Sequence, residues 1–459
     1  MSALGYLSRY VLQPLYNDLR GFGGILRSVD HWRSLANESP ESIRRLTQRR
    51  LARLLRRAFT ETTYYRDLFI EHGIDKRLEN PDVLATIPYL DKQIIRAQPE
   101  AFLNQTIRPE RLIRSMTGGS TSEPLIFYRD HGTHCMRWGL HIAQNEALGW
   151  RHGEWYGMVW GAAQDLPTGD TLRARALNLF LHRRILLNAM SLDESAILAF
   201  IRQVRRKRPQ FVYGYPVLLE YVATVVLEKG WTFPAPKYVV VTAEKLTESA
   251  RTTIEKAFGC PALDRYASRE FGVVADQVPG TNYLRIAPAN VIVEIAPIDT
   301  ADPSFGELVI TDLLNVGMPM IRYRTGDVGR LTRVGPDGRQ EWRLSEISGR
   351  TTDLLVTREG RIVSGTAVDP FFEEYIGYDQ LQVVQETTER FTVRVKPNKD
   401  YGPQSEMQIR EKLVDVCGEG IEVKIELVDN IQRDPSGKFR IVISHVAPRI
   451  LGRHFHSSQ

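Results

Sequence analysis

The sequence predicts an α/β protein with a large, multi-layer N-terminal α/β domain and a small, mobile α+β C-terminal domain. Three observations support this prediction. The 459 residues exceed what one ordinary core needs, and 42% are hydrophobic and 25% charged, as in a typical globular protein. From about residue 110, short apolar runs alternate with helical stretches. Beyond about residue 352 the pattern becomes that of a compact unit, so we expect domains over residues 1–351 and 352–459.

Charge and cysteine content limit the functional class. The formal net charge is +5, and the basic residues gather near the N-terminus, a weak indication of an acidic partner. Cys135, Cys260 and Cys417 lack further ligands at metal-binding spacing, so we expect a reducing, cytoplasmic setting without structural zinc. No run reaches the roughly 18 apolar residues of a transmembrane helix. Residues 1–20 also lack the form of a signal peptide.

Two helices are predicted near the N-terminus. The second begins at Ser39, which can cap it, followed by Pro40 and Glu41 at positions that suit a helix start. Its arginine face, over residues 44–57, is interpreted as solvated and not as a nucleic-acid surface, because no reading motif accompanies it. The first helix is amphipathic and is interpreted as docked on its own domain, with contact to a membrane surface or to a partner as the alternatives. Its apolar stripe consists of Leu4, Leu7, Val11, Leu12, Leu15 and Tyr16.

A strand followed by a helix is clear in the middle of the chain. The apolar run Tyr238–Val241 predicts a buried strand, and Thr247 then caps a helix that ends at Gly259. A second strand over residues 308–310 precedes an acidic turn at Asp312.

The C-terminal part has its own strands and helix. Apolar residues alternate with polar ones over residues 391–395, and the same pattern returns over residues 423–427, so both segments are expected to be strands. Ser405 and Gln408 predict a capping box for a helix that ends at Gly418.

Small and hydroxyl-bearing residues form one loop, Ser115–Pro124. Glycine lets backbone N–H groups approach phosphate oxygens, and hydroxyls add donors, so the loop suits a phosphate cradle. Such clusters are also common in ordinary turns. The loop lacks the Gly-Lys-Ser/Thr ending of a Walker A motif.

Two further strings carry carboxylates. In Tyr266–Gly272, the tyrosine can lie on a purine and Glu270 can hold Mg²⁺ directly or through water; the alternative is a buried tyrosine and a surface glutamate. In Arg322–Asp327, Gly326 permits a tight turn that presents Asp327. That carboxylate can accept ribose hydroxyls, cap a helix or pair with an arginine.

The last two strings concern the C-terminal unit. Gly349–Asp353 lies where the composition changes between the two units, so it is a candidate hinge. Asp434–Arg440 forms a turn with Lys438 at its tip, a flexible charge able to meet a phosphate or a carboxylate. Most exposed lysines have no such role.

Together and in this order, the five strings resemble the adenylate-forming superfamily, most closely its phenylacetate-CoA ligase branch, which includes homologues found with capsular polysaccharide biosynthesis. The resemblance covers about residues 40 to 445 and includes the connecting segments 63–66, 87–92 and 213–216. It implies an AMP-forming ligase. Such an enzyme activates a carboxylic acid as its acyl-adenylate with release of pyrophosphate, then transfers the acyl group, most often to coenzyme A. ATP and Mg²⁺ are the implied cofactors, with coenzyme A as co-substrate.

The resemblance also implies roles for individual residues. Lys438 would bridge the α-phosphate and the substrate carboxylate, Glu270 would position Mg²⁺, and Asp353 would mark the hinge on which the small domain rotates before the thioester step. The nucleotide would be held by Thr117, Gly118, Gly119, Ser120 and Thr121 at its phosphates, Ala243, Glu244 and Tyr266 at adenine, Asp327 at the ribose, and Arg350 at ribose or phosphate.

The sequence departs from the family pattern in two places. Ser122 and Glu123 replace the usual glycine and the frequent lysine of the phosphate loop, so we expect phosphate binding to differ from the family pattern. Some relatives carry a cysteine-rich metal site after the Tyr-x-x-x-Glu string, whereas residues 283–295 contain no cysteine.

Several alternatives stay open at this point. The acyl acceptor is coenzyme A or an amine or hydroxyl, for example on an amino sugar. A nucleotide-binding scaffold in a polysaccharide assembly complex, without catalysis, is a further alternative, which the retention of four site residues argues against: Glu270, Asp327, Arg350 and Lys438. The oligomeric state is open, with a homodimer among the options. An apolar or aromatic pocket for the acid is suggested by Trp138, Met158, Tyr213 and Tyr215, which core packing explains as well.

Overall fold

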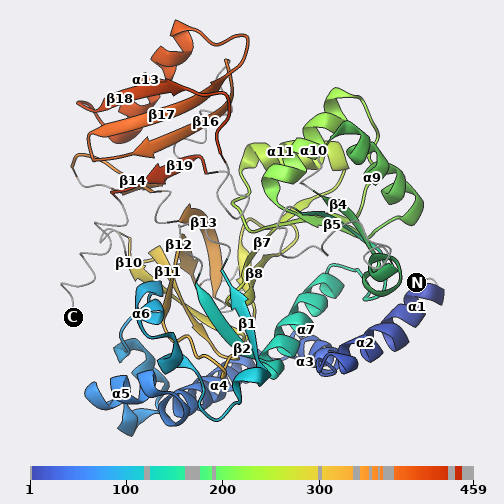
Figure 1. Ribbon diagram of the computed structural model, residues 1–459, viewed down its shortest axis with the longest axis vertical. Helices are drawn as coiled ribbons and strands as arrows, with labels where there is room; N and C mark the ends of the chain where they lie inside the picture. Colours follow the sequence, from blue (N-terminus) through green and yellow to red (C-terminus); the bar gives the residue numbers. More distant parts are fainter. Residues whose placement is uncertain are drawn as a thin grey trace.

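The computed structural model describes residues 3–117, 125–160, 176–188, 193–297, 302–333, 342–350, 354–359, 362–364, 377–432 and 440–446. For residues 348–350, 354 and 362–364 it describes the backbone alone. A large sheet with helices packed around it forms the body, and a smaller sheet with its own helix forms the C-terminal unit (Figure 1). The predicted α/β class is confirmed.

Eleven of the described strands form one mixed sheet in the order β10-β11-β12-β13-β9-β8-β7-β6-β5-β3-β4. Strands β4, β3, β5, β6 and β7 are parallel, and the remaining neighbours are antiparallel. The predicted strand over residues 238–241 is central β6, which is buried as its β-branched run requires. The strands are β3 (Tyr156–Trp160), β4 (Arg184–Asn188), β5 (Phe211–Gly214), β6 (Tyr238–Thr242), β7 (Ala262–Ser268), β8 (Gly272–Gln277), β9 (Leu284–Ile286), β10 (Val291–Pro297), β11 (Phe305–Asp312), β12 (Tyr323–Thr332) and β13 (Arg343–Arg350).

Helices α9 (Glu194–Lys207), α10 (Pro216–Glu228) and α11 (Glu248–Phe258) pack with the parallel half of the sheet around one hydrophobic core. The predicted start and end of α11 are confirmed. The Thr247 hydroxyl accepts a hydrogen bond of 3.1 Å from the Ala250 N–H, and Gly259 ends the helix with a left-handed φ of 67°.

The antiparallel half packs against the N-terminal helices and the hairpin of β1 (Leu112–Met116) and β2 (Ile126–Asp130). The predicted start of α4 is confirmed, because the Ser39 hydroxyl accepts a hydrogen bond from the Ser42 N–H. Helices α3 and α7 pack closely together, and the Trp32 indole donates to the Met136 carbonyl at 2.8 Å. The helical elements here are α3 (Ile25–Leu35), α4 (Pro40–Glu61), α5 (Thr63–Glu71), η2 (Asp75–Arg77), η3 (Pro81–Thr86), α6 (Lys92–Ala97), η4 (Pro99–Phe102), η5 (Pro109–Arg111) and α7 (His131–Ala147).

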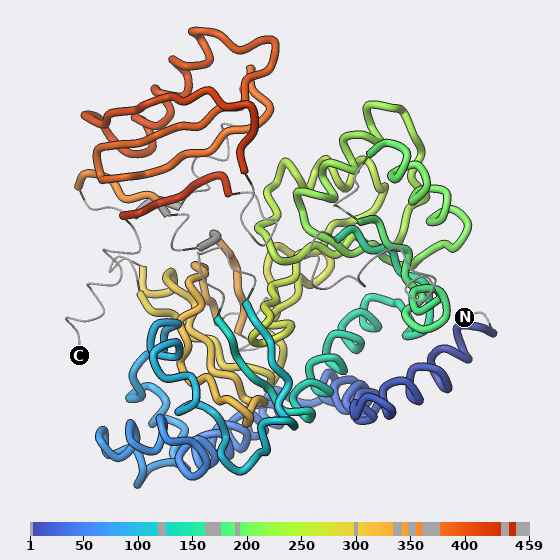
Figure 2. The backbone as a smooth tube through the Cα atoms, viewed as in Figure 1, coloured from blue at the N-terminus to red at the C-terminus, as the bar shows by residue number. Residues whose placement is uncertain are grey.

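The first helical segment consists of α1 (Ala3–Leu7), the π-helical turn η1 (Ser8–Leu12) and α2 (Gln13–Leu19), which follow one another without a break (Figure 2). It docks on its own chain at η7 (Leu177–His182). The contact is polar: the Ser8 hydroxyl and the Gln13 amide both donate to the Leu181 carbonyl, at 3.0 and 2.6 Å. Three of the six residues in the predicted apolar stripe are exposed to solvent: Leu7, Val11 and Leu15.

Across the part of the chain that the structure describes, no helix combines the length and the apolar character that a membrane span requires.

Within the part of the chain that the structure describes, the C-terminal unit has its own core, built from residues between Leu355 and Val442. One correction concerns its helix: α13 begins at Pro403, so Gly402 is the N-cap and Ser405 occupies the third helical position, where its hydroxyl accepts from the Gly402 N–H. Proline fits the first helical position, which moves the start ahead of the predicted box. The domain boundary at residues 351 and 352 stays a prediction. The elements are β14 (Leu354–Val356), β15 (Ile362–Ser364), β16 (Tyr378–Gln385), β17 (Arg390–Pro397), α13 (Pro403–Cys417), β18 (Glu422–Leu427) and β19 (Val442–Ser444), with the sheet order β18-β17-β16-β19.

A buried histidine beside α7 makes stability depend on pH. His152 is only 5% exposed, and burial followed by the charges of Arg9 and Arg33 lowers its pKa from 6.5 to about 4. The imidazole of His152 is therefore protonated below about pH 6.5 in the unfolded chain but only below about pH 4 in the folded chain. In this window we expect the His152 contribution to the free energy of unfolding to fall by up to about 1.4 kcal/mol for each pH unit.

Urea unfolding of wild type and His152→Gln between pH 4 and 7 measures this contribution, because glutamine keeps a polar side chain without titrating. The wild type should lose stability more steeply than the variant as the pH falls. His72→Gln, at an exposed position after α5, is the control and should follow the wild type. Equal slopes for wild type and His152→Gln would contradict the assignment.

Candidate active site

A tyrosine and an aspartate meet at the centre of the large sheet. Tyr266 lies near the end of β7, and its hydroxyl donates a hydrogen bond of 2.7 Å to Oδ2 of Asp327 on β12. The tyrosine is 9% exposed. Burial, then the negative charge and hydrogen bond of Asp327, raise the pKa of Tyr266 well above its usual range. The phenol therefore stays protonated and fixes the direction of the carboxylate.

The turn before Asp327 is held by a buried glutamate. Glu307 on β11 is 3% exposed, pairs with Arg324 and accepts a hydrogen bond of 3.0 Å from the Gly326 N–H. Gly326 has a φ of 79°, as the predicted tight turn requires, and the Asp327 N–H donates to the Thr325 hydroxyl at 3.0 Å. Sequence reasoning missed Glu307. Its signal was a single charge within the apolar run of β11, which a buried strand tolerates only when that charge is paired.

Arg350 lies beside this carboxylate in the sheet. In the ladder of β12 and β13 it is the direct partner of Asp327, so the two residues predicted to contact ribose occupy adjacent strands. Only the backbone of Arg350 is described.

The residues predicted beside adenine follow the carboxyl end of β6. Thr242, the last residue of β6, pairs with Arg265 of β7, so Ala243 and Glu244 leave the sheet next to Tyr266. Ala243 has a φ of 74°, which is uncommon for a residue with a side chain and often occurs at ligand sites. In open α/β sheets, ligands bind outside the carboxyl ends of the parallel strands.

Thr117 closes the base of the predicted phosphate loop. Its N–H donates to the Leu125 carbonyl, and its hydroxyl accepts from the Leu125 N–H, both at 2.9 Å. The side chain is buried. The loop residues Gly118, Gly119, Ser120 and Thr121 lie outside the described residues, as do Ser122, Glu123, Asp353 and Lys438.

Glu270 follows β7 in the turn to β8. It lies near enough to Tyr266 for its charge to contribute to the raised pKa of that tyrosine. Within the described residues, no three His, Cys, Asp or Glu side chains are grouped as metal ligands. A single carboxylate nevertheless fits Mg²⁺, which commonly binds one or two protein carboxylates together with substrate phosphates and water.

Aromatic side chains gather next to this site, at the ends of β3 and β5. Trp160 stacks on Tyr213 with ring centres 5.5 Å apart and lies 4.3 Å from Tyr215. Met158 is the ladder partner of Tyr213. Trp138, on α7, is 50% exposed and belongs to the edge of the group, because its ring lies 5.7 Å from that of His141, which lies 5.9 Å from that of Tyr213. The structure therefore places the four residues that suggested an acid pocket in one region.

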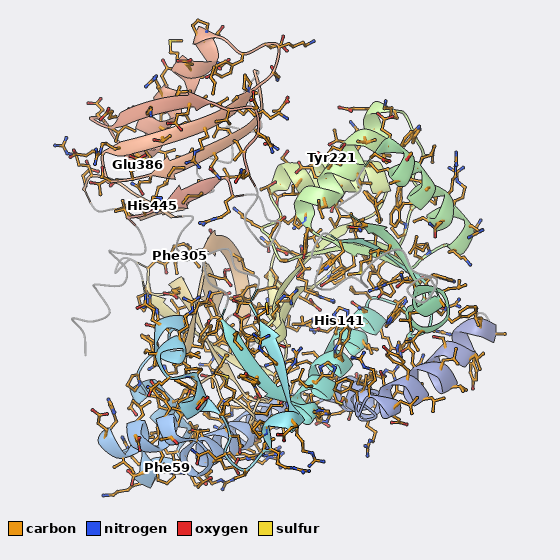
Figure 3. The ribbon with its side chains drawn as sticks, in the orientation of Figure 1. Phe59, His141, Tyr221, Phe305, Glu386 and His445 are labelled. Carbon is orange, nitrogen blue, oxygen red and sulfur yellow. The ribbon has the colours of Figure 1, made fainter. Side chains whose placement is uncertain are left out.

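An ion pair between β7 and β8 lies next to the aromatic group. Arg265 on β7 is 1% exposed and bonds both carboxylate oxygens of Asp276, at 2.6 and 3.0 Å. It also contacts His141 on α7 (Figure 3), whose pKa falls to about 3 because of burial and then the arginine charge. This histidine is neutral near pH 7, so it is not a source of positive charge for an anionic substrate.

Comparisons with known proteins agree with the resemblance drawn from the motifs. Residues 355–445 match the family model described as the CapK C-terminal domain. The chain is 24% identical to Protein CapK of Staphylococcus aureus over 398 residues, which covers 83% of this chain and 85% of that protein. It is 25% identical to the phenylacetate-coenzyme A ligase of Thermus thermophilus, covering 69% of this chain and 72% of that enzyme.

Solved structures show the same fold. A 2-hydroxyisobutyryl-CoA ligase in its postadenylation state matches with a TM-score of 0.65 and 20% identity, covering 90% of this chain and 91% of the other. An open conformation of that ligase with 2-HIB-AMP and CoA matches with a TM-score of 0.56 and 20% identity, covering 86% and 90%. The predicted resemblance and the fold of adenylate-forming ligases are confirmed.

Proposed function

We propose that this homologue of CapK and of the phenylacetate-coenzyme A ligases, with the fold of adenylate-forming ligases, activates a carboxylic acid as its acyl-adenylate and transfers the acyl group to coenzyme A. The class of AMP-forming ligase rests on this homology. The hydrogen bond between Tyr266 and Asp327, at the carboxyl end of the parallel strands, is the observation that carries the assignment of a nucleotide site.

ATP would lie across the ends of β6 and β7. Its adenine would lie between Ala243–Glu244 and Tyr266, and its ribose hydroxyls would donate to Asp327. Arg350, the neighbour of Asp327 in the sheet, would contact ribose or phosphate. Thr117, at the base of the loop, would start the phosphate cradle that Gly118, Gly119, Ser120 and Thr121 continue.

Charge neutralisation is the main task of such a site. A carboxylate oxygen forms a bond to the α-phosphorus while the bond from that phosphorus to pyrophosphate breaks, so two anions must approach each other. Mg²⁺ held at Glu270 would neutralise phosphate charge. Lys438 would stabilise the negative charge that develops at the α-phosphate. The arginine–aspartate pair behind the aromatic group adds no net charge there.

Thioester formation is the second half-reaction. The sulfur of coenzyme A, after losing its proton, forms a bond to the acyl carbon as the bond from that carbon to AMP breaks. Rotation of the C-terminal unit about Asp353 would remove Lys438 and admit the thiol. The division into domains at residues 351 and 352 is part of this proposal.

The aromatic group at Trp160, Tyr213 and Tyr215 favours an acid with an apolar or aromatic body, since such rings provide contact area with few polar requirements. Incubation with ATP, Mg²⁺ and a panel of aryl, fatty and amino acids, with and without coenzyme A, tests the assignment by mass spectrometry. We expect AMP, pyrophosphate and an acyl thioester for an aryl or fatty acid. If the acyl-adenylate reacts only with amines or hydroxyl compounds, the acyl acceptor is of that class and is not coenzyme A. If the protein binds nucleotide but forms no product, it is a nucleotide-binding scaffold and not a ligase.

Tyr266→Phe tests the nucleotide site separately from the chemistry. Removing the hydroxyl deprives Asp327 of this hydrogen bond, and a hydrogen bond to a charged group contributes about 1.5 to 3 kcal/mol. We expect ATP to bind about tenfold more weakly in calorimetry, with kcat little changed. Tyr221→Phe is the matched control, because Tyr221 is a 47% exposed tyrosine on α10 (Figure 3). Unchanged ATP affinity in Tyr266→Phe would refute the assignment.

A further inference from the structure

The N-terminal helical segment exposes a row of large apolar side chains. Leu7, Val11, Leu15 and Leu19 recur every four residues and are 44%, 50%, 56% and 80% exposed. Beside the row, Tyr6 and Tyr10 lie with their ring centres 4.4 Å apart and are also exposed. A monomer rarely leaves a continuous apolar row of this length in water unless it serves an interaction.

The opposite side of the same segment is fixed to the body. Gly5 and Ser8 are buried, and the backbone of Gly5 approaches Gly153 so closely that a Cβ on Gly153 would lie 2.5 Å from the Gly5 carbonyl oxygen. The bonds from Ser8 and Gln13 to Leu181 lie in the same contact. The segment is therefore held by small and polar residues, and the apolar row points away from the contact that fixes the helix.

The π-helical turn η1 helps to keep the row on one side. In an α-helix, a four-residue step advances about 40° beyond a full turn, so a row with this spacing drifts around the axis. The wider turn over Ser8–Leu12 rotates the chain in the opposite sense between Leu7 and Val11. The drift from Val11 to Leu19 is thereby partly offset.

The surrounding charge is strongly positive. Residues 1–60 contain eleven arginines, no lysine and four acidic residues, a formal charge of +7, whereas the whole chain has +5. Seven of the eleven arginines lie on α4, whereas residues 3–19, which carry the apolar row, contain only Arg9 and Asp18 as charged residues. The exposed arginines of this part are Arg20, Arg27, Arg44, Arg45, Arg49, Arg53 and Arg56.

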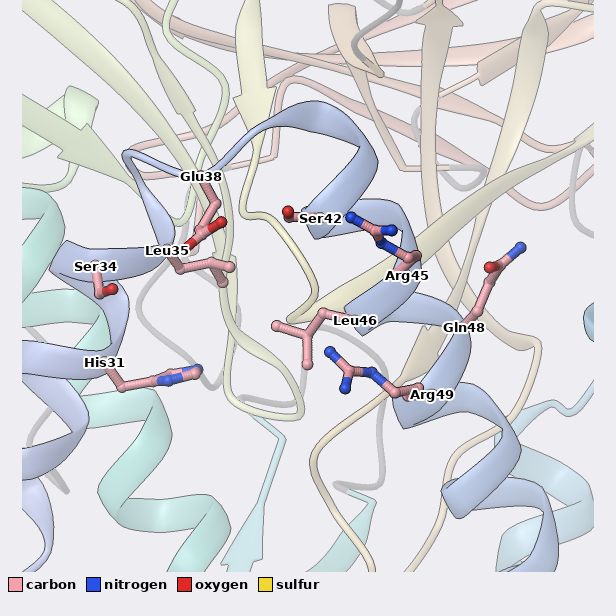
Figure 4. A pocket seen from close by; sticks show the side chains of 9 residues that line it. All are labelled: His31, Ser34, Leu35, Glu38, Ser42, Arg45, Leu46, Gln48 and Arg49. Atoms are coloured by element: carbon pink, nitrogen blue, oxygen red, sulfur yellow. The ribbon is translucent and has the colours of Figure 1, made fainter.

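A groove between α3 and α4 adds a place for an anionic group. It has a volume of about 770 Å³, and Arg45, Arg49 and His31 line it together with one acid, Glu38. His31 and Arg49 point into the groove from opposite sides (Figure 4). This groove lies apart from the nucleotide site, among the N-terminal helices.

We propose that the N-terminal helices dock the protein on the surface of an anionic lipid bilayer, with the apolar row entering the boundary of the acyl chains and the arginines contacting lipid phosphates. The apolar row would supply the buried area of an interfacial helix, which lies on a membrane without crossing it, and the arginines of the following helices would supply the attraction to anionic lipid. Helices α1 to α4 follow one another along one edge of the molecule, away from the four-stranded sheet of the C-terminal unit (Figure 1). Docking at this edge leaves that unit free to move.

Co-sedimentation with vesicles of phosphatidylcholine, with and without phosphatidylglycerol, tests the proposal. We expect the full chain to sediment with phosphatidylglycerol vesicles and to be released by salt. Leu15→Glu/Leu19→Glu should lower the partition coefficient by about a hundredfold or more, because each leucine loses its burial in the acyl chains. Arg45→Gln/Arg49→Gln should lower it by about fivefold for each arginine and weaken its salt dependence.

Met407→Glu is the matched control, because Met407 is a 53% exposed apolar residue on α13, and it should bind as the wild type does. Circular dichroism melts of every variant separate loss of binding from loss of folding. The proposal is overturned if the wild-type protein does not bind phosphatidylglycerol vesicles at low salt. It is equally overturned if the leucine variants are folded and bind these vesicles as the wild type does. It is also overturned if light scattering without lipid shows a dimer that the leucine variants dissociate, or if the arginines bind RNA and not vesicles.

Discussion

Lys438→Ala is expected to lower the rate of acyl-adenylate formation by about 10²- to 10³-fold while ATP still binds. The lysine carries the positive charge that would face the developing charge on the α-phosphate, and a single preorganised group of this kind commonly contributes about 3 to 4 kcal/mol to lowering the barrier. ATP affinity should change less, because Tyr266, Asp327 and Glu270 belong to the body of the protein. Rapid quench of the adenylate, together with calorimetric titration of ATP, measures both quantities.

Lys399→Ala is the matched control, since Lys399 is an exposed lysine of the same C-terminal unit. It should form adenylate at the wild-type rate. Lys438→Arg keeps the charge but changes its shape, so it should recover only part of the activity. Adenylation by Lys438→Ala at the rate of the control would remove the lysine from the mechanism.

Arg137→Met is expected to lower the free energy of unfolding by about 3 to 5 kcal/mol. Arg137 on α7 and Asp312 at the end of β11 form an ion pair, and their side chains are 5% and 1% exposed. Among the described residues, the substitution leaves the buried carboxylate with the backbone N–H groups of Leu314 and Asn315 as donors. Burial already raises the pKa of Asp312, so the loss should shrink at low pH, where the neutral carboxyl group is tolerated.

Urea denaturation at several pH values checks this prediction. Arg56→Ala is the control, because the pair of Arg56 with Glu79 is 56% and 66% exposed and should contribute no more than about 1 kcal/mol. A loss below about 1 kcal/mol for Arg137→Met at neutral pH would show that the buried pair does not tie α7 to the sheet.

Short sequence patterns correctly predicted helix caps and a buried strand, because these features depend on neighbouring residues in the chain. Ser39 and Thr247 cap helices as expected, and the apolar run at 238–241 forms a buried parallel strand. The start of α13 was misplaced because two overlapping start signals, Pro403 and Ser405, lie two residues apart. The antiparallel half of the sheet was not predicted in detail, since its pairing joins strands through tertiary contacts that no short motif encodes.

The site could be predicted residue by residue but not as a network. Tyr266 and Asp327 were both named from the sequence, yet their hydrogen bond spans 61 residues and follows from the sheet order. Arg265 and Asp276 form a buried pair that supports the aromatic group, and neither stood out. The arginine within the strand that leads into Tyr266 was the available signal, since a buried charge requires a partner. The partner itself becomes visible only when β7 and β8 pair.

Acid-dependent exchange of labelled pyrophosphate into ATP tests the account most directly, because it detects reversible adenylate formation before any acyl acceptor is involved. With Mg²⁺ and a panel of aryl, fatty and amino acids, we expect exchange that requires one class of acid and is lost in Asp327→Ala. If ATP binds at the site of Tyr266 and Asp327 but no acid in the panel supports exchange, the activation of a carboxylic acid at this site is contradicted.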